Sequence, residues 1–286
     1  MSGAASGRSF FCRVCLVGVL AAVVLVSAAG CGLKTGPTQQ SSISEPLTGA
    51  AVTDVRVTMG AGKLSLGSGS SDLVSGTVSY NISSWKPNVK RTGSSVAITQ
   101  GEQKGLSGLG GKWINDWSLK LGNAPMRLSV EAGAYQGDYK LGGLVLRGLS
   151  IKDGASKTTV AFDSPNPGQI DLFTYETGAS SVTMTGLANA NFQKMRFKGG
   201  AGSYTMDFSG TLRSDASVSI EAGVGTVQLI VPNGVNAQVK VSGTLTDISV
   251  QGGWLVKDKV YSLSGSGKRL TITVSMTVGS LKLISQ

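Results

Sequence analysis

A short phrase that ends on a glycine recurs along this chain at a nearly constant interval. The glycines of six copies are Gly60, Gly133, Gly154, Gly178, Gly200 and Gly223. The last five are spaced by 21, 24, 22 and 23 residues, and a weaker relative of the phrase ends at Gly279. A period in this range indicates a repeat architecture in which each unit is one supersecondary motif.

Each copy has apolar residues five and three positions before the glycine, as Leu128 and Val130 stand before Gly133. This alternation is typical of a β-strand with one face turned inward. A second alternating run follows the glycine, so each unit is interpreted as a strand, a glycine corner and a second strand. One unit cannot form a core alone, and neighbouring units therefore have to stack into a solenoid. At the corner we expect the glycine to have a positive φ or to form a bulge.

The composition favours an all-β body, because the chain is rich in glycine and poor in charged and aromatic residues. Residues 101–117 lack a strand pattern, and we interpret them as a loop. A β-sandwich with regularly spaced hairpins stays open as the alternative fold, since spacing alone does not separate it from a solenoid.

A charged residue stands two positions before the glycine in each of the five consecutive copies. These residues are Glu131, Lys152, Glu176, Lys198 and Glu221. Their signs alternate, and the inward apolar positions on either side predict that they point outward. Stacked strands lie about 4.8 Å apart, so the five side chains are predicted to form one ladder that fixes the register between coils.

The first residues have the layout of a secretory signal, with Arg8 and Arg13 ahead of an uncharged apolar run over residues 16–29. That run is shorter than the roughly twenty residues of a membrane-spanning helix. Residues 27–31, Ser-Ala-Ala-Gly-Cys, resemble the lipobox of bacterial lipoproteins, although the family most often has leucine where this chain has Ala28. The resemblance implies that the chain is cut before Cys31 and that the Cys31 thiol carries a lipid.

Three segments follow from these observations. Residues 1–30 are predicted to be a cleaved signal peptide. Residues 31–49 are mostly small and polar, and we interpret them as a flexible tether because they have too little apolar surface to fold. Residues 50–286 are predicted to form the β-solenoid. The other two cysteines, Cys12 and Cys15, lie in the signal peptide, so no cysteine pair remains for a disulfide.

The body also resembles the toastrack family of bacterial envelope domains over most of residues 50–286. The phrases that carry the resemblance are Gly60-Ala61-Gly62, Trp85-Lys86-Pro87, Asp207-Phe208-Ser209-Gly210 and Val231-Pro232-Asn233. The resemblance implies a single-stranded right-handed β-helix of the kind often called a "putative adhesin". The same domain is also found at the end of cell-wall-stress response proteins. This chain lacks the membrane helices of those stress-response relatives.

Several classes of chemistry are excluded or disfavoured by the residues. The chain has no histidine, which removes the Ser-His-Asp arrangement and the usual zinc sites. Its glycine-rich phrases are not followed by Lys-Ser or Lys-Thr, so a nucleotide loop is not predicted. Single aspartates were expected at turns, and these are Asp138, Asp153, Asp163, Asp171 and Asp207. We therefore predict no catalytic residue, no metal site and no cofactor, although a carboxylate pair brought together only by folding stays open.

The four tryptophans are Trp85, Trp113, Trp117 and Trp254. We interpret them as caps over the ends of the solenoid in preference to platforms for sugar stacking, because open ends would expose apolar side chains and strand edges.

The formal net charge of +10 includes the two signal-peptide arginines. Lysine and arginine are spread along the chain, mostly singly and without interleaved aromatics, so no nucleic-acid partner is expected. We predict a non-enzymatic, lipid-anchored scaffold on the exported side of the cell envelope, facing wall polymer, lipid or another envelope protein. The alternatives are a β-helix carbohydrate-active enzyme and an accessory subunit in envelope-stress sensing.

Overall fold

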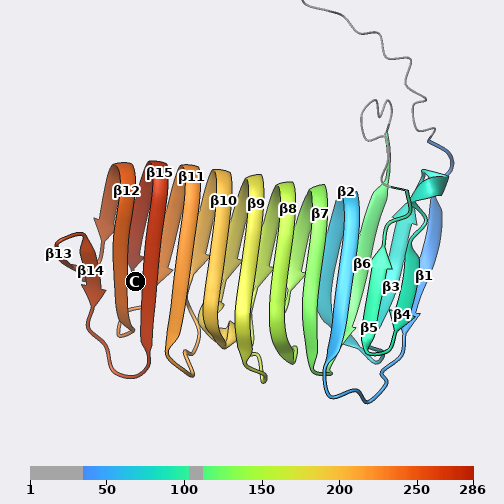
Figure 1. Cartoon of the computed structure of the whole chain (residues 1–286), viewed down its shortest axis with the longest axis horizontal. Helices are drawn as coiled ribbons and strands as arrows, with labels where there is room; N and C mark the ends of the chain where they lie inside the picture. The colour runs from blue at the N-terminus through green and yellow to red at the C-terminus, as the bar shows by residue number, and fades with distance from the viewer. Residues whose placement is uncertain (1–34, 103–111) are drawn as a thin grey trace, which may run out of the picture. The chain divides into compact units, whose positions relative to one another are not determined.

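The computed structural model describes residues 35–102 and 112–286, apart from the side chains of Leu245 and Thr246. These residues form β-strands and two short 3-10 helices (Figure 1). The elements are β1 (Gln39–Glu45), β2 (Thr53–Ser70), β3 (Val74–Tyr80), η1 (Ser83–Trp85), β4 (Asn88–Thr92), β5 (Ser95–Thr99), β6 (Asn115–Gly122), β7 (Met126–Lys140), β8 (Leu146–Ala161), β9 (Ile170–Thr185), η2 (Leu187–Ala190), β10 (Phe192–Asp207), β11 (Ala216–Val231), β12 (Asn236–Gln251), β13 (Leu255–Lys257), β14 (Val260–Leu263) and β15 (Arg269–Ser285).

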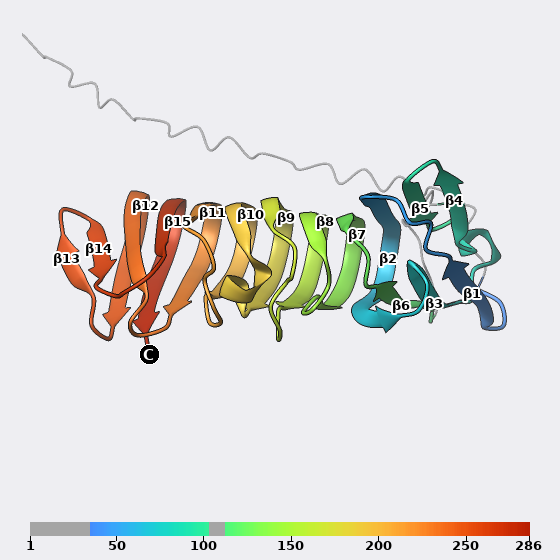
Figure 2. The same cartoon turned by 90° about the horizontal axis from the view of Figure 1, so that it is seen from below.

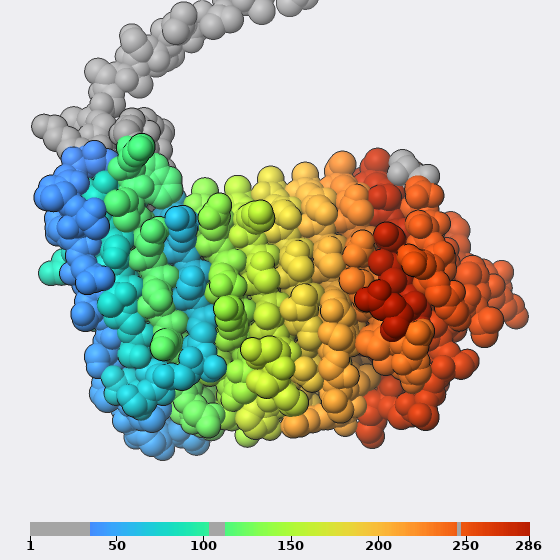
Figure 3. Space-filling view, turned by 180° about the vertical axis from the view of Figure 1, so that it is seen from behind, coloured from blue at the N-terminus to red at the C-terminus, as the bar shows by residue number. Residues whose placement is uncertain are grey.

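The central strands β7 to β11 are stacked in sequence order, and each pairs in parallel with the next. Figure 3 shows the same order as successive colour bands across the back of the body. Each strand continues through its repeat glycine, and a short return segment leads to the next coil. The predicted all-β solenoid is confirmed, and the sandwich alternative is wrong because its hairpins would pair antiparallel.

The core lies inside the coils and is built from the alternating apolar positions. The position three residues before the glycine shows this most clearly, because its residues pair with one another from strand to strand and are at most 1% exposed. They are Val130, Ile151, Tyr175, Phe197 and Ile220. Parallel strands in register repeat one position on every coil, so apolar side chains pile into continuous columns.

The N-terminal end departs from sequential stacking. Strand β2 pairs in parallel with β7, and strands from the intervening part of the chain pair with its other edge. The first half of β2 pairs with β5 and the second half with β6, after which β3 and β1 continue the sheet antiparallel (Figure 1). The loop interpretation of residues 101–117 is wrong at its end, where β6 begins at Asn115; residues 103–111 lie outside the described residues.

The tether interpretation of residues 31–49 is wrong for Gln39–Glu45, which form β1. This strand closes the edge of β3, with Ile43 buried and Glu45 bonded to Arg91 at 3.1 Å. An edge strand is held by backbone hydrogen bonds, so a segment with few large apolar residues still folds when a neighbouring strand offers unpaired groups.

The C-terminal end is also out of sequence order. Strand β15 lies between β11 and β12 and pairs in parallel with both, and the β13–β14 hairpin covers part of the outer edge of β12. Strand β15 is therefore a coil stacked on β11, but the alignment of its weak repeat is wrong by two residues, because Gly279 pairs with Gly225 and Thr277 stands level with the repeat glycine Gly223. The coil formed by β12 has a bulged register near Gly243 and was missed by the sequence pattern.

The tryptophans lie at the two ends of the stack, as the capping interpretation predicts. Trp85 and Trp117 are buried in the N-terminal part, where Trp113 packs edge-on against Trp85 at a ring distance of 5.7 Å. Trp254 is buried beside the β13–β14 hairpin at the other end. The indole rings of Trp85, Trp117 and Trp254 are buried and not free to stack on a sugar, whereas Trp113 is only partly buried.

Candidate functional site

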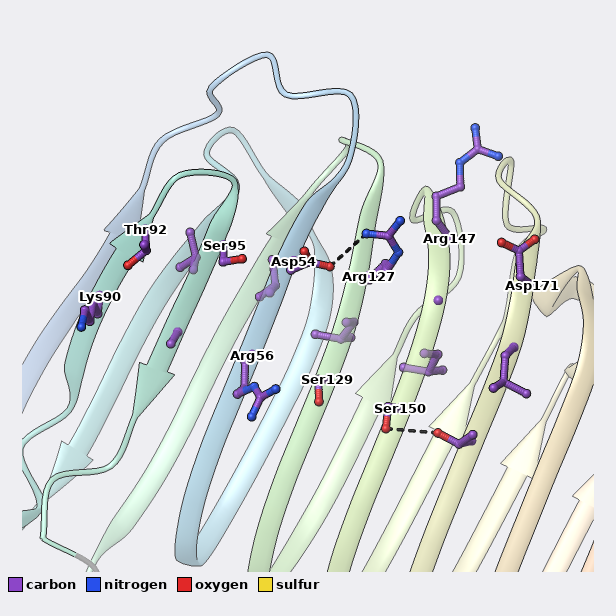
Figure 4. A pocket seen from close by; sticks show the side chains of 18 residues that line it. Asp54, Arg56, Lys90, Thr92, Ser95, Arg127, Ser129, Arg147, Ser150 and Asp171 are labelled. Carbon is purple, nitrogen blue, oxygen red and sulfur yellow. Dashed lines mark hydrogen bonds and ion pairs between the residues drawn. The ribbon is translucent and has the colours of Figure 1, made fainter.

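A groove of about 670 Å³ lies on the outer face of the body, near the N-terminal end of the stack (Figure 4). Strands β2, β7, β8 and β9 supply its floor, and the β4–β5 hairpin forms one wall. Figure 2 shows this hairpin standing out beyond the level of β7 to β9. The charged and hydroxyl side chains that line the groove are Asp54, Arg56, Lys90, Thr92, Ser95, Arg127, Ser129, Arg147, Ser150, Asp171 and Thr174.

Strand alternation explains why these side chains share one face. The inward neighbours, such as Val55 and Leu128, are buried in the core, so the residues between them have to point outward. Register then places them in rows across the strands. In one row Arg56 pairs with Ser129, Ser129 with Ser150, and Ser150 with Thr174. The groove thus has a line of hydroxyls beside its cations.

The charges of the groove are only partly paired. Arg127 bonds to Asp54 at 3.2 Å, and Arg56 bonds to Glu131 outside the groove at 3.3 Å, each through a single N–H. Within the described part of the chain, Lys90 and Arg147 are in no ion pair. A guanidinium has five N–H donors, so both paired arginines keep donors free for another acceptor.

Two local features direct the arginines. Gly148 faces Arg127 on the next strand, and a Cβ at Gly148 would lie 3.4 Å from the Cγ of Arg127. The missing side chain lets the Arg127 stem lie over β8. Arg147 is the extra residue of a β-bulge, since Met126 pairs with Leu146 and Arg127 with Gly148. Bulges re-aim side chains, and Arg147 points out along the rim of the groove in Figure 4.

The five charged ladder residues occupy partner positions on consecutive strands. Glu131 pairs with Lys152, Lys152 with Glu176, Glu176 with Lys198, and Lys198 with Glu221. Among the described residues no ion pair joins two of them, and Glu131 instead bonds to Arg56. Any stabilisation by the ladder therefore has to come from the alternation of sign at strand spacing, because no close contact joins its members.

Glu176→Lys tests the ladder, because it places three like charges on successive strands. We expect a loss of a few tenths of a kcal/mol per exposed pair at low salt, and a smaller loss at high salt because ions screen exposed charges. Chemical denaturation at two salt concentrations measures the difference. A loss that does not shrink as salt rises would reject the electrostatic role.

The repeat glycines serve a different purpose from the predicted one. Neither Gly178 nor any other of the six has a positive φ. Instead, their backbones stack so closely that a Cβ would meet the carbonyl oxygen of the preceding coil's glycine, at 2.4 Å for Gly178 on Gly154 and 2.5 Å for Gly200 on Gly178. The corner needs glycine for close approach of neighbouring backbones.

A buried carboxylate was missed by the turn interpretation of the aspartates. Asp153 lies inside the corner of β8, is 7% exposed, and has no cation partner among the described residues. Its Oδ2 accepts hydrogen bonds from Tyr175 at 2.8 Å, Ser156 at 3.0 Å and Tyr135 at 3.3 Å, and its Oδ1 accepts one from Thr177. The inward positions Leu149 and Ile151 alternate along the strand, and the next inward position is Asp153, so the same pattern predicts its burial.

The other aspartates are mostly exposed. Asp138 and Asp171 point outward from strands β7 and β9, so the turn prediction is wrong for them as well. Asp207 ends β10 and accepts the Ser209 N–H at 2.8 Å, as expected for a turn. Asp163 follows β8 in a return segment.

Burial raises the pKa values of the tyrosines around this carboxylate. Desolvation is the largest cause for Tyr135, Tyr139 and Tyr175, and the negative charge of Asp153 adds to it. An unfolded tyrosine ionises near pH 10, whereas these stay neutral in the folded state. Their contribution to stability is fully present below that pH and is lost as pH rises above it.

The side chains of the groove are suited to recognition. Within residues 35–102 and 112–286, no three acidic, histidine or cysteine side chains gather to hold a metal ion. Asp153, the buried carboxylate, is enclosed by hydroxyl donors and lies away from the groove. Exposed cations beside hydroxyls can bind anionic and polyhydroxylated groups. Cys31, the predicted lipidation site, lies outside the described residues.

Two family models match the chain. Residues 34–172 match the N-terminal domain of toast_rack, and residues 183–283 match the C-terminal domain of LiaF, a cell wall-active antibiotics response protein. The folded body is of the toastrack type. Together the matches span both the N-terminal cap with the groove and the C-terminal coils, which the resemblance of the sequence motifs had predicted.

Solved structures also match this chain. A "putative cell adhesion protein" from Clostridium sporogenes aligns over 87% of this chain and 100% of its own, at 17% identity and a TM-score of 0.50. A "putative adhesin" from Parabacteroides distasonis aligns over 87% of this chain and 97% of its own, at 11% identity and a TM-score of 0.38. No protein with a curated description matches the sequence.

Proposed function

We propose that this protein is a non-enzymatic scaffold of the cell envelope, anchored by a lipid at Cys31, and that its groove binds an envelope component. The carrying observation is the groove on β2, β5, β7, β8 and β9, whose exposed cations and hydroxyls are suited to recognition. The match to a cell wall-active antibiotics response domain supports an envelope role. The groove lining contains no histidine and no cysteine, which supports binding over catalysis.

Anchoring through Cys31 is supported by the lipobox-like sequence ahead of it. Within the described residues no helix is long and apolar enough to cross a membrane. Strand β1 begins at Gln39, so only residues 32–38 separate the anchor from the body. A polypeptide spans at most about 3.6 Å per residue, which limits the length of this connection. On this proposal the N-terminal end of the stack, with its groove, is held close to the membrane surface.

Cys31→Ser is expected to move the protein from the membrane fraction to the soluble fraction, because two or more acyl chains supply stable attachment and the serine cannot be lipidated. Fractionation followed by detergent partitioning measures the change. Thr35→Ala, beyond the lipobox-like residues 27–31, is the control and should leave the protein in the membrane. Detergent partitioning of the cleaved Cys31→Ser protein would contradict the anchor.

A carbohydrate-active enzyme is the alternative to a binding scaffold. Incubation of the full chain with a panel of envelope glycans, followed by a count of new reducing ends, separates the two. We expect binding without new ends. Turnover that disappears when a single carboxylate is changed would overturn the scaffold proposal.

The match of residues 183–283 favours a second candidate, an accessory subunit that reports envelope stress to a partner. Such a role requires a protein partner with its own membrane segments. Co-purification of the full chain from cells with and without wall-active antibiotic tests it, and a stress-dependent partner would favour this candidate.

A further inference from the structure

The polar lining of the groove has a composition that restricts its ligand. Arg56, Lys90, Arg127 and Arg147 place four cations around it, against the carboxylates Asp54 and Asp171. Lys90 and Arg147 stand on opposite sides and are unpaired within the described residues. A ligand with several negative charges spread along its length matches this arrangement better than one compact anion.

The spaces between the cations carry hydroxyls. Ser129, Ser150 and Thr174 form a row across β7, β8 and β9, and the Thr174 hydroxyl donates to Ser150 at 3.1 Å. Each hydroxyl both donates and accepts, so the row suits a ligand that is rich in hydroxyls itself. Asp171 adds a further acceptor at the end of the groove.

Concavity argues for a chain and against a flat bilayer. The β4–β5 hairpin stands beyond the coils on one side and limits how closely a planar surface approaches the floor (Figure 2). Leu172 is the one large apolar side chain of the lining among the exposed large hydrophobics, at 37%. An extended chain can lie across the strands, where successive outward positions repeat about every 4.8 Å.

We infer that the groove binds a phosphodiester-linked polyol or sugar chain, with phosphates on the arginines and Lys90 and ligand hydroxyls on the serine and threonine row. This inference rests on the proposed binding function and names its ligand class. Guanidinium groups bind phosphate through charge-assisted N–H···O bonds, often in pairs. Arg127 makes a single bond to Asp54, and Arg56 makes a single bond to Glu131. Each guanidinium therefore keeps N–H donors for a phosphate.

The test is equilibrium binding of poly(glycerol phosphate) to the full chain in detergent. Arg127→Gln with Arg147→Gln should weaken binding at least about tenfold, whereas Lys140→Gln with Lys157→Gln should change it less than about threefold. Both pairs remove the same charge from β7 and β8, the second pair beyond the glycine corner. Melting temperatures confirm that both pairs fold.

Three other probes identify the source of any binding. Neutral dextran and the carboxylate polymer hyaluronate should bind weakly, and phosphatidylglycerol vesicles should bind no more tightly to the wild type than to the groove pair. The inference would be overturned if both variant pairs lost the same affinity for poly(glycerol phosphate), or if hyaluronate bound as tightly as poly(glycerol phosphate). Vesicle binding that depends on the groove arginines would also overturn it. If the groove pair loses binding to isolated envelopes although the wild type does not bind poly(glycerol phosphate), the ligand class is wrong but the scaffold function stands.

Discussion

Asp153→Ala is expected to lower the free energy of unfolding by about 3–5 kcal/mol, because it removes the acceptor of several buried hydroxyls. Tyr135, Tyr175 and Thr177 donate to this carboxylate from neighbouring coils, so their hydroxyls would lose a partner inside the core. Urea denaturation of the full chain in detergent measures the loss. Asp138→Ala removes an exposed carboxylate from β7 and should stay within about 0.5 kcal/mol.

Two tyrosines provide a second, finer comparison. Tyr175→Phe deletes a donor to Asp153 and should cost about 1–3 kcal/mol. The Tyr204 hydroxyl is buried and has no hydrogen-bond partner among the described residues, so Tyr204→Phe should be neutral or stabilising, while keeping the edge-on contact with Phe197. Equal effects from both changes would show that the hydrogen bond from Tyr175 to Asp153 does not stabilise the corner.

Gly178→Ala is expected to destabilise the body by about 1–3 kcal/mol, the usual cost of forcing extra atoms into a packed site. The added Cβ would lie 2.4 Å from the Gly154 carbonyl oxygen, and a backbone atom in a paired strand cannot move aside cheaply. Thermal or urea unfolding measures the effect. Valine at this position should be worse than alanine because it is larger and β-branched.

Gly67→Ala in β2 is the matched control for the corner glycine. Gly67 is also a strand residue without a positive φ, and a Cβ there meets nothing within 4 Å. Alanine should be neutral or slightly stabilising at Gly67, since it reduces the freedom of the unfolded chain. If Gly178→Ala behaves like Gly67→Ala, close stacking does not explain the repeat glycines.

The central coils could be predicted from the sequence because one local rule determines them. Alternation around residues such as Val130 and Ile151 identifies the inward face, and the glycine spacing gives the register that pairs Glu131 with Lys152. Both signals lie within a single coil. The fold of β7 to β11 follows from them once neighbouring units are required to stack.

The ends of the stack could not be predicted in the same way. Pairing of β15 with β11 joins segments that are separated by all of β12, and β1 folds only because β3 leaves an edge open to it. Such pairings depend on which edge is unpaired in space, and no periodic pattern records that. The groove could not be predicted for the same reason, because one of its walls is the β4–β5 hairpin, which is inserted between β2 and β7 and follows no repeat pattern.

The corner shows an error of a different kind. The sequence predicts a positive φ or a bulge at the repeat glycines, whereas the structure shows no positive φ there and a close stacking of their backbones. Asp153 was assigned to a turn although it follows Ile151 by two positions and so shares its inward face. Both errors came from applying residue preferences where the alternation already gave the answer.

Lysine footprinting tests most directly that the groove is the face in contact with the envelope. Acetylation of the full chain in isolated cell envelopes is compared, residue by residue, with acetylation of the purified chain in detergent. Lys90 should be protected in the envelope, whereas Lys140 and Lys157, which point outward beyond the glycine corner, should label equally in both. Equal labelling of Lys90 in the two samples, or equal protection of all three lysines, would contradict the proposed role of the groove.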